Sequence, residues 1–152
     1  MQLTLFSDYA LRLVLYLAVH EDRVVPIEEV SRAYGISKNH LVKVVALLVE
    51  ENVVESVRGR SGGLRLARSP RDITIGWLVR RTEPDMDLVE CFDPRTNTCP
   101  IAPVCGLKHA LREAREAFLA ALDRSTVAEL AAPRKHQPLI ALWSRALANG
   151  GS

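Results

Sequence analysis

The sequence predicts a mainly α-helical protein, a winged helix-turn-helix with a long dimerisation helix. Three observations lead to this fold class: two short helical segments that meet at Gly35, a glycine-rich hairpin that follows them, and a heptad-spaced helix further along the chain. At 152 residues, 48% of them hydrophobic, the chain can bury a core. We expect a winged helix-turn-helix over residues 1–80, a cysteine-bearing loop over 81–105, a dimerisation helix over 106–130, and a C-terminal extension over 131–152 that is partly helical and then disordered.

The first predicted helix covers residues 7–20 and has one apolar face. Hydrophobic residues recur there at helical spacing: Phe6, Ala10, Leu13, Val14 and Leu17. A second, short helix is expected to begin at Pro26, because proline suits a first helical turn. Gly35 should end it as a left-handed cap.

A third helix is predicted after Ser37, whose hydroxyl can accept a hydrogen bond from an unpaired backbone amide. Its apolar residues follow the i, i+3, i+4, i+7 pattern and should face inward: Leu41, Val44, Val45 and Leu48. Together with Ser37, the candidate base-reading residues near its amino-terminal end are Lys38, Asn39, His40 and Lys43. A short helix, a tight turn and a second helix with a polar front form a helix-turn-helix.

Residues 54–66 predict a β-hairpin, because two short strand-like runs bracket a loop with three glycines and two arginines. The glycines permit positive φ and close backbone approach. Arginines on such a wing suit the narrow minor groove of DNA or its phosphates. The wing residues that we expect to contact DNA are Arg58, Arg60, Ser61, Gly62, Gly63 and Arg65.

The net charge of +2 is unevenly distributed along the chain. Residues 37–71 carry seven cations and three anions, which gives a local charge of +4 and leaves about −2 elsewhere. Such a patch on a near-neutral protein is typical of contact with a polyanion, here double-stranded DNA. A solvated basic surface, or a winged fold used for protein contact, would be the alternative.

The second half of the chain contains a short helix, a long loop and a long helix. Residues 74–82 should form the short helix, with Ile75, Leu78 and Val79 inward, and residues 83–105 a loop with four prolines. Residues 106–124 predict the long helix, whose heptad seam is Leu107, Leu111, Ala114, Phe118 and Ala121. This seam can pair with a second subunit or pack on its own domain. A last helix is expected over 138–148, with residues 149–152 disordered and not necessarily native.

All three cysteines, Cys91, Cys99 and Cys105, lie in the loop, with seven and then five residues between them. An odd number without an export signal argues against a disulfide scaffold. Thiolates are soft donors for iron–sulfur clusters, Zn(II) or Cu(I), but this spacing is too wide for the CxxC pairs of most zinc knuckles. We therefore favour an iron–sulfur cluster over a zinc site, a thiol redox switch or inert cysteines.

Iron–sulfur clusters take four ligands as a rule, so three cysteines leave one ligand missing. Candidates close in sequence are Glu90, Asp93 and His109, and Asp8 is a distant one. An acid such as Asp8 is also favoured near a helix amino terminus for its charge alone.

Several protein classes are disfavoured. No run of roughly eighteen apolar residues occurs, and no basic leader precedes an apolar stretch, so we expect a cytoplasmic protein with no membrane contact. No Ser/His/Asp or phosphate-loop pattern is present, and the glycines over 59–63 follow no Rossmann strand. We do not expect an enzyme.

The order of helix-turn-helix, wing over 58–66, three-cysteine loop and long helix resembles the Rrf2-type bacterial transcription regulators. The resemblance covers roughly residues 1–130. It implies a homodimer whose long helices cross, and cysteines that hold a two-iron or four-iron cluster. The state of that cluster would set the affinity for DNA.

Within that family, residues 6–12 and 37–43 look most like the nitric-oxide sensors, and the seven-residue gap after Cys91 looks more like the iron regulators. In the nitric-oxide sensors an aspartate at the position of Asp8 supplies the fourth ligand from the partner subunit. The resemblance thus implies a repressor that holds a four-iron rather than a two-iron cluster and senses nitric oxide. The alternatives are a regulator of iron or cluster status, and a zinc- or thiol-switched DNA-binding module.

Overall fold

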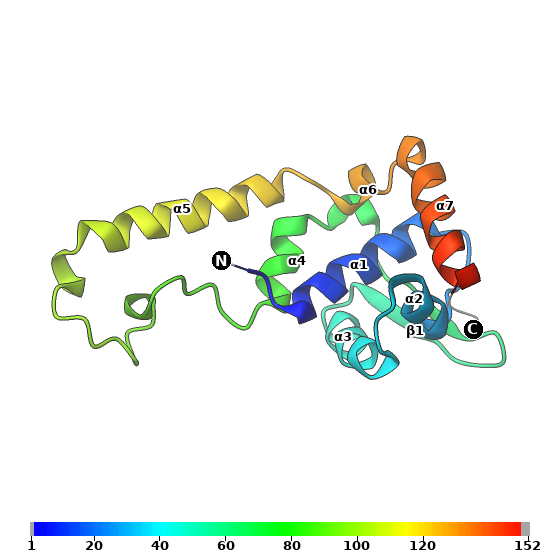
Figure 1. The fold of residues 1–152 in the computed structure, drawn as a ribbon, viewed down its shortest axis with the longest axis horizontal. Helices are drawn as coiled ribbons and strands as arrows, with labels where there is room; N and C mark the ends of the chain where they lie inside the picture. Colours follow the sequence, from blue (N-terminus) through cyan, green and yellow to red (C-terminus); the bar gives the residue numbers. More distant parts are fainter. Residues whose placement is uncertain (1, 150–152) are drawn as a thin grey trace.

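Helix α1 (Leu5–Val19) is the central element of the structure, a computed structural model that describes residues 2–149 (Figure 1). Thr4 caps it, since its side-chain oxygen accepts a hydrogen bond from the Ser7 amide. The apolar face predicted from sequence is the buried one, and its fully enclosed residues are Ala10, Leu13, Val14 and Leu17. These residues form the middle of the hydrophobic core.

Helices α2 (Ile27–Tyr34) and α3 (Lys38–Glu50) form the helix-turn-helix. Gly35 ends α2 with φ +64°, the left-handed conformation in which glycine carries no Cβ penalty. Ser37 caps α3, because its hydroxyl oxygen accepts a hydrogen bond of 3.3 Å from the His40 amide. The predicted cap residues and the inward face of α3 are therefore confirmed, with Leu41, Val44 and Leu48 buried and Val45 half-buried.

Strands β1 (Val54–Val57) and β2 (Gly63–Leu66) pair in antiparallel register, with Val54 opposite Leu66. Val25 extends this hairpin inward, because it exchanges backbone hydrogen bonds of 2.9 and 2.8 Å with Leu64. A Cβ on Gly63 would lie 2.5 Å from the Val25 carbonyl oxygen. Glycine at 63 therefore allows the wing to pack on the rest of the head, which comprises residues 2–82 and 124–149.

Helix α5 (Gly106–Asp123) joins the head where it meets α4 (Ile75–Thr82). At this joint the Arg80 guanidinium donates to both Asp123 carboxylate oxygens, at 2.8 and 2.7 Å, and Leu119 is buried. Gly76 permits the close approach, since a Cβ there would lie 2.8 Å from the Leu119 carbonyl oxygen. A 3-10 turn, η1 (Pro70–Asp72), precedes α4, and α6 (Val127–Leu130) follows α5.

The predicted long loop runs beside α5, and the two form an arm, residues 83–123, that projects from the head (Figure 1). The loop contains only two short 3-10 turns, η2 (Glu90–Phe92) and η3 (Ala102–Val104). Phe92 attaches it to α5, because the guanidinium carbons of Arg112 and Arg115 lie 5.9 and 5.0 Å from its ring centre. None of the helices in the described part of the chain has the length and apolar character to cross a membrane.

The last helix, α7 (Pro133–Asn149), is longer than predicted. We expected it to begin at Pro138, but it begins at Pro133, another residue suited to a first turn, and Pro138 lies inside it. Packing offsets the backbone hydrogen bond that Pro138 cannot donate, since Trp143 is only 7% exposed and packs at a tilt on Tyr16 and edge-on against Tyr34. The disorder expected from residue 149 is wrong for Asn149, which ends the helix, and residues 150–152 lie outside the described residues.

Candidate nucleic-acid interface and metal-ligating loop

The polar front of α3 is presented to solvent as the sequence predicts. Its candidate base-reading residues are all exposed: Ser37, Lys38, Asn39, His40 and Lys43. The buried face of the same helix fixes it against α1, so these groups stand on a rigid support. An exposed amide and cations at the amino-terminal end of such a helix can hydrogen-bond to base edges in a major groove.

The wing tip adds exposed arginines beside α3. Arg58, Arg60 and Ser61 are exposed, and Gly59 adopts φ +118°, which makes the turn at the tip possible. A hollow of about 430 Å³ lies between Val42 and Val45 of α3 and the wing residues around Arg60. The helix and wing therefore form one concave surface.

Two of the predicted DNA-contacting cations are neutralised within the chain. Lys38 forms an ion pair with Glu28 of α2, and this hydrogen bond holds the pKa of the Glu28 carboxyl below its ordinary value. Arg65 forms an ion pair with Glu55 across the hairpin. Within residues 2–149, no carboxylate forms an ion pair with Lys43, Arg58 or Arg60. These three cations are free to neutralise phosphates.

Gly62 and Gly63 are half-buried and serve the hairpin itself. A Cβ on Gly62 would lie 2.6 Å from the Val57 carbonyl oxygen, as one on Gly63 would meet Val25. Neither glycine has a positive φ, so the conformational freedom expected of the wing is needed only at Gly59. Contact between DNA and Gly62 or Gly63 stays a prediction.

The three cysteines are half-buried free thiols on the projecting loop. Their donor chemistry suits iron, because three soft thiols without a disulfide follow one another on a single exposed segment. In the described part of this single chain, however, no three His, Cys, Asp or Glu side chains gather as a metal site. The residues fit a cluster as donors, and closing the loop around it requires the loop to change shape.

The candidate fourth ligands differ in how they are engaged. Glu90 accepts a hydrogen bond from the Thr98 hydroxyl at 3.2 Å, and His109 is exposed on α5. Arg95 donates to both carboxylate oxygens of Asp93, which holds the pKa of that carboxyl below its ordinary value.

Asp8 lies in the first turn of α1, on the head rather than on the arm. Both of its carboxylate oxygens are held by Arg12, at 2.9 and 2.7 Å, and Arg12 also lies 5.8 Å from the Tyr34 ring centre. Sequence reasoning missed Arg12, although an acid four residues before an arginine on a helix is a readable ion-pair signal.

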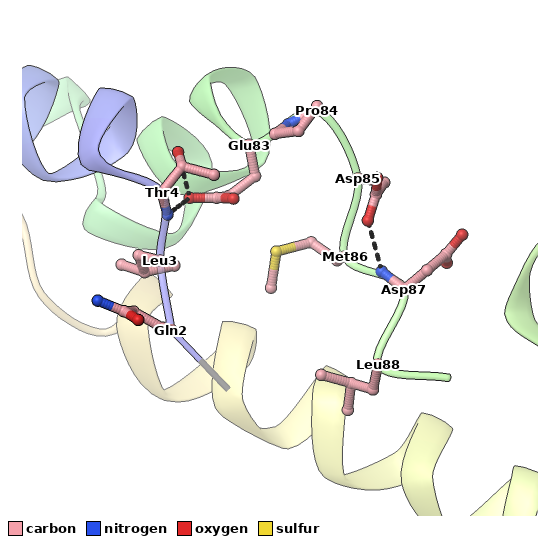
Figure 2. Close-up of a pocket in the computed structure, with 9 residues that line it drawn as sticks. All are labelled: Gln2, Leu3, Thr4, Glu83, Pro84, Asp85, Met86, Asp87 and Leu88. Carbon is pink, nitrogen blue, oxygen red and sulfur yellow. Dashed lines mark hydrogen bonds between the residues drawn. The ribbon is translucent and has the colours of Figure 1, made fainter. Parts of the chain in front are cut away.

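The start of the loop is tied to the start of α1. Figure 2 shows a hollow of about 580 Å³ where the N-terminal segment faces residues 83–88. There a Glu83 carboxylate oxygen accepts hydrogen bonds from the Thr4 amide and hydroxyl, at 2.8 and 3.1 Å. Thr4 caps α1, so the loop base and the helix that carries Asp8 are connected. Pairing across 79 residues gives no local sequence signal.

The heptad seam of α5 is largely uncovered within one chain. Leu107 is 67% exposed, Ala114 and Ala121 are exposed, and Leu111 and Phe118 are half-buried. The residue of α5 that is buried against the head is Leu119, outside the seam. Helix α5 therefore does not pack its whole seam on the head of its own chain.

The fold and the exposed basic surface define a winged helix-turn-helix DNA-binding protein. A family model described as "Iron-dependent Transcriptional regulator", Rrf2, matches residues 3–133. The chain belongs to the Rrf2 family, and it is a transcriptional regulator rather than an enzyme.

The relatives include the HTH-type transcriptional regulator NsrR of Bacillus subtilis, which is 49% identical over 131 residues, 86% of this chain and 90% of that protein. NsrR of Halalkalibacterium halodurans is 47% identical over 131 residues, which are again 86% of this chain and 90% of that protein. Among solved structures, T. potens IscR has a TM-score of 0.70 at 24% identity and covers 86% of this chain and 85% of its own. The oxidized form of Staphylococcus aureus CymR has a TM-score of 0.69 at 24% identity, over 86% and 96% of the two chains. These structures support the fold alone.

Proposed function

We propose that this chain is a homodimeric repressor that responds to nitric oxide through an iron–sulfur cluster. The observation that carries the proposal is the set of three free thiols on one projecting loop, in a chain almost half identical to proteins named NsrR. Cys91, Cys99 and Cys105 would hold a four-iron cluster, with Asp8 of the partner subunit as the fourth ligand. Asp8 lies at the start of α1 on the head, and no three possible ligand side chains gather in the described part of this chain, which favours a fourth ligand supplied by the partner.

When bound, the cluster supplies iron that reacts with nitric oxide, and a carboxylate is a harder and more labile ligand for it than a thiolate. The other steps belong to the chain itself. Arg12 holds the Asp8 carboxylate whenever it is not a ligand, so Asp8 exchanges one cationic partner for another. The first turn of α1 moves with Asp8. Glu83, at the base of the loop, is connected to the same turn because it accepts hydrogen bonds from Thr4.

Movement of α1 reaches the recognition helix through direct packing. Leu13 and Val14 of α1 share the core with Leu41, Val44 and Leu48 of α3. The Tyr9 ring also lies 6.0 Å from the His40 ring on the exposed side of α3. A dimer must present two such helices about 34 Å apart along DNA. A small rotation of each head is therefore enough to lower operator affinity.

The test is operator binding by anaerobic wild-type protein with and without iron, followed by titration with nitric oxide. We expect the iron-loaded protein to bind and nitric oxide to release it. Cys99→Ser should lose iron and the response, whereas Thr98→Ser, the neighbouring exposed position, should keep both. Equal operator affinity of the iron-loaded and iron-free proteins would contradict the proposal.

A regulator of iron status is the second candidate, since the matching family model is described as iron-dependent and seven residues separate Cys91 from Cys99. An iron chelator distinguishes the two functions. If the chelator releases the DNA and nitric oxide does not, the result would favour iron sensing. A colourless protein that carries zinc would instead favour the zinc- or thiol-switched module.

A further inference from the structure

Glu28 places a carboxylate on the DNA-facing surface. It lies in the first turn of α2 and lines the hollow of about 430 Å³ between α3 and the wing, together with Val42 of α3 and Arg60 of the wing. Among the described residues that line this hollow, Glu28 is the one acid. A carboxylate repels phosphates, so its presence here affects how the surface binds DNA.

The hollow lies where one strand of the DNA backbone has to pass. A winged helix-turn-helix puts its second helix in the major groove, and an arginine-bearing wing suits the neighbouring minor groove. One sugar–phosphate strand separates these two grooves. That strand therefore runs between α3 and the wing, across the hollow that Glu28 and Arg60 line.

The carboxylate of Glu28 holds the ammonium group of Lys38, the first residue of α3. This ion pair joins the two helices of the helix-turn-helix, and its hydrogen bond lowers the pKa of Glu28, so the carboxylate is ionised at neutral pH. Both side chains are more than half exposed, at 54% for Lys38 and 55% for Glu28. An ion pair so exposed is weak, so DNA can separate it. Lys38 is thus available to DNA, but only in competition with Glu28.

The competition differs between an operator and other DNA. In the major groove a guanine offers a lysine two acceptors, O6 and N7, in a fixed arrangement. A phosphate offers Lys38 a single contact of the same kind as the ion pair that it must replace. Glu28 is therefore displaced readily where the sequence places such a base at Lys38, and poorly where only phosphates are within reach. In residues 2–149 no carboxylate restrains Lys43, Arg58 or Arg60 in this way.

We propose that Glu28 is a specificity-determining residue, which keeps Lys38 from binding the phosphates of non-operator DNA and releases it to a base of the operator. The proposal rests on DNA binding by α3 and the wing, as part of the proposed function, and does not depend on the cluster. It assigns to α2 a share in sequence discrimination, although the base-reading side chains lie on α3.

Glu28→Gln tests the proposal, because it removes the charge and keeps the size of the side chain. In anaerobic iron-loaded protein the affinity for a non-operator duplex should rise about tenfold at low salt, and the slope of log affinity against log salt should steepen by about one for each bound subunit. Operator affinity should rise only about twofold, so that the ratio of the two affinities falls about fivefold. Fluorescence anisotropy with both duplexes over a salt series measures these values. An equal rise on both duplexes, or no rise on the non-operator duplex, would overturn the proposal.

Glu113→Gln is the matched control for the change in net charge. Glu113 is exposed on α5, away from the DNA-facing surface, and forms no ion pair within residues 2–149. Its substitution should leave the ratio of operator to non-operator affinity unchanged. A fall in the ratio as large as that of Glu28→Gln would show that net charge alone is responsible and would overturn the proposal.

A second background shows whether Glu28 acts through Lys38. In Lys38→Met protein there is no ammonium group to release, so adding Glu28→Gln should leave the affinity ratio nearly as it is. Both side chains are exposed, so neither substitution removes core packing. A ratio that falls as far without Lys38 as with it would overturn the role of the ion pair.

The failure of this proposal is distinguishable from the failure of the proposed function. Glu28→Gln protein that still releases the operator with nitric oxide but keeps the wild-type affinity ratio would overturn the role of Glu28 alone. Wild-type protein that ignores nitric oxide, while its Glu28→Gln variant loses discrimination, would overturn the nitric-oxide response and support the role of Glu28.

Discussion

Cations on the DNA-facing surface differ in whether the chain itself neutralises them. Lys38 and Arg65 have carboxylate partners in Glu28 and Glu55, whereas Arg60 at the wing tip has none among residues 2–149. A cation with a carboxylate partner must give up that ion pair to bind a phosphate, which for an exposed pair costs up to about 1 kcal/mol. Cations that look equivalent in the sequence therefore differ in the fold, according to whether a carboxylate lies beside them.

Arg60→Ala should weaken binding to all DNA sequences and reduce the slope of log affinity against log salt by about one, because each phosphate contact releases condensed counterions. Fluorescence anisotropy over a salt series measures this slope. Arg124→Ala, at an exposed arginine that ends α5 and lies outside the basic segment 37–71, is the matched control and should leave the slope as it is. Asn39→Ala should instead relax sequence preference at constant slope. An unchanged slope for Arg60→Ala would remove the wing tip from the interface.

The residue patterns predicted which face of a helix is buried better than they predicted which distant segments contact each other. Helical periodicity gave the buried sides of α1 and α3, since burial of a face depends only on local spacing. The bond of Glu83 to Thr4 and the approach of Gly63 to Val25 depend on segments distant in sequence. No local pattern encodes such contacts.

Elements are held to the head by a few specific joints. Arg80 and Asp123 connect α4 to α5, and Arg80 donates to both carboxylate oxygens. These hydrogen bonds hold the pKa of Asp123 below its ordinary value of 3.8. The projecting arm therefore depends on a carboxylate that stays ionised.

The lowered pKa of Asp123 implies a pH-dependent stability with a definite sign. The folded protein binds this proton less readily than the unfolded chain, so the stabilisation is complete above the ordinary pKa of 3.8 and is lost as pH falls through the lower, folded value. Asp123→Asn removes this term. Thermal melts from neutral pH to about pH 3 should show a smaller acid-side loss for Asp123→Asn than for wild type. Asp22→Asn, at an exposed acid without an ion pair in residues 2–149, should match wild type.

Helix α7 extends past the residues matched by the family model, yet it belongs to the core of this chain. Its Trp143 ring centre lies 4.6 Å from that of Tyr16 and 5.7 Å from that of Tyr34. Tyr16 also donates to Glu29 at 2.7 Å, and burial is the main cause that raises its pKa. No local pattern predicts this cluster, because its aromatic residues come from three separate helices.

Trp143→Ala should destabilise the folded chain by about 3 kcal/mol, since it leaves a cavity among buried aromatic rings. Chemical denaturation monitored by circular dichroism measures the loss. Leu142→Ala, the exposed neighbour on the same helix, should cost little. Equal stabilities of the two variants would mean that α7 does not pack on the head in solution.

The whole molecule separates its charges and its apolar surface between two parts. The head carries the basic segment over 37–71, and the arm carries an acidic loop and a largely uncovered apolar seam. Heptad spacing predicted the seam, but the choice between self-packing and pairing needed the position of the arm. Since α5 turns Leu119 rather than the seam toward the head, pairing with a second copy is what the geometry favours.

Ala114→Asp should convert the proposed dimer to a monomer, because it puts a charge in the middle of the seam without touching the core of the head. Light scattering should then give a mass near 16.9 kDa in place of about twice that value. The same substitution at Ala120, exposed on another side of α5, should leave the dimer intact. A monomer presents one recognition helix, so it loses the second half-site about 34 Å away and with it most of the operator affinity. A dimer that survives Ala114→Asp but dissociates with Ala120→Asp would place the interface on the opposite side of α5. The seam would then not be needed for the dimer or for its operator affinity.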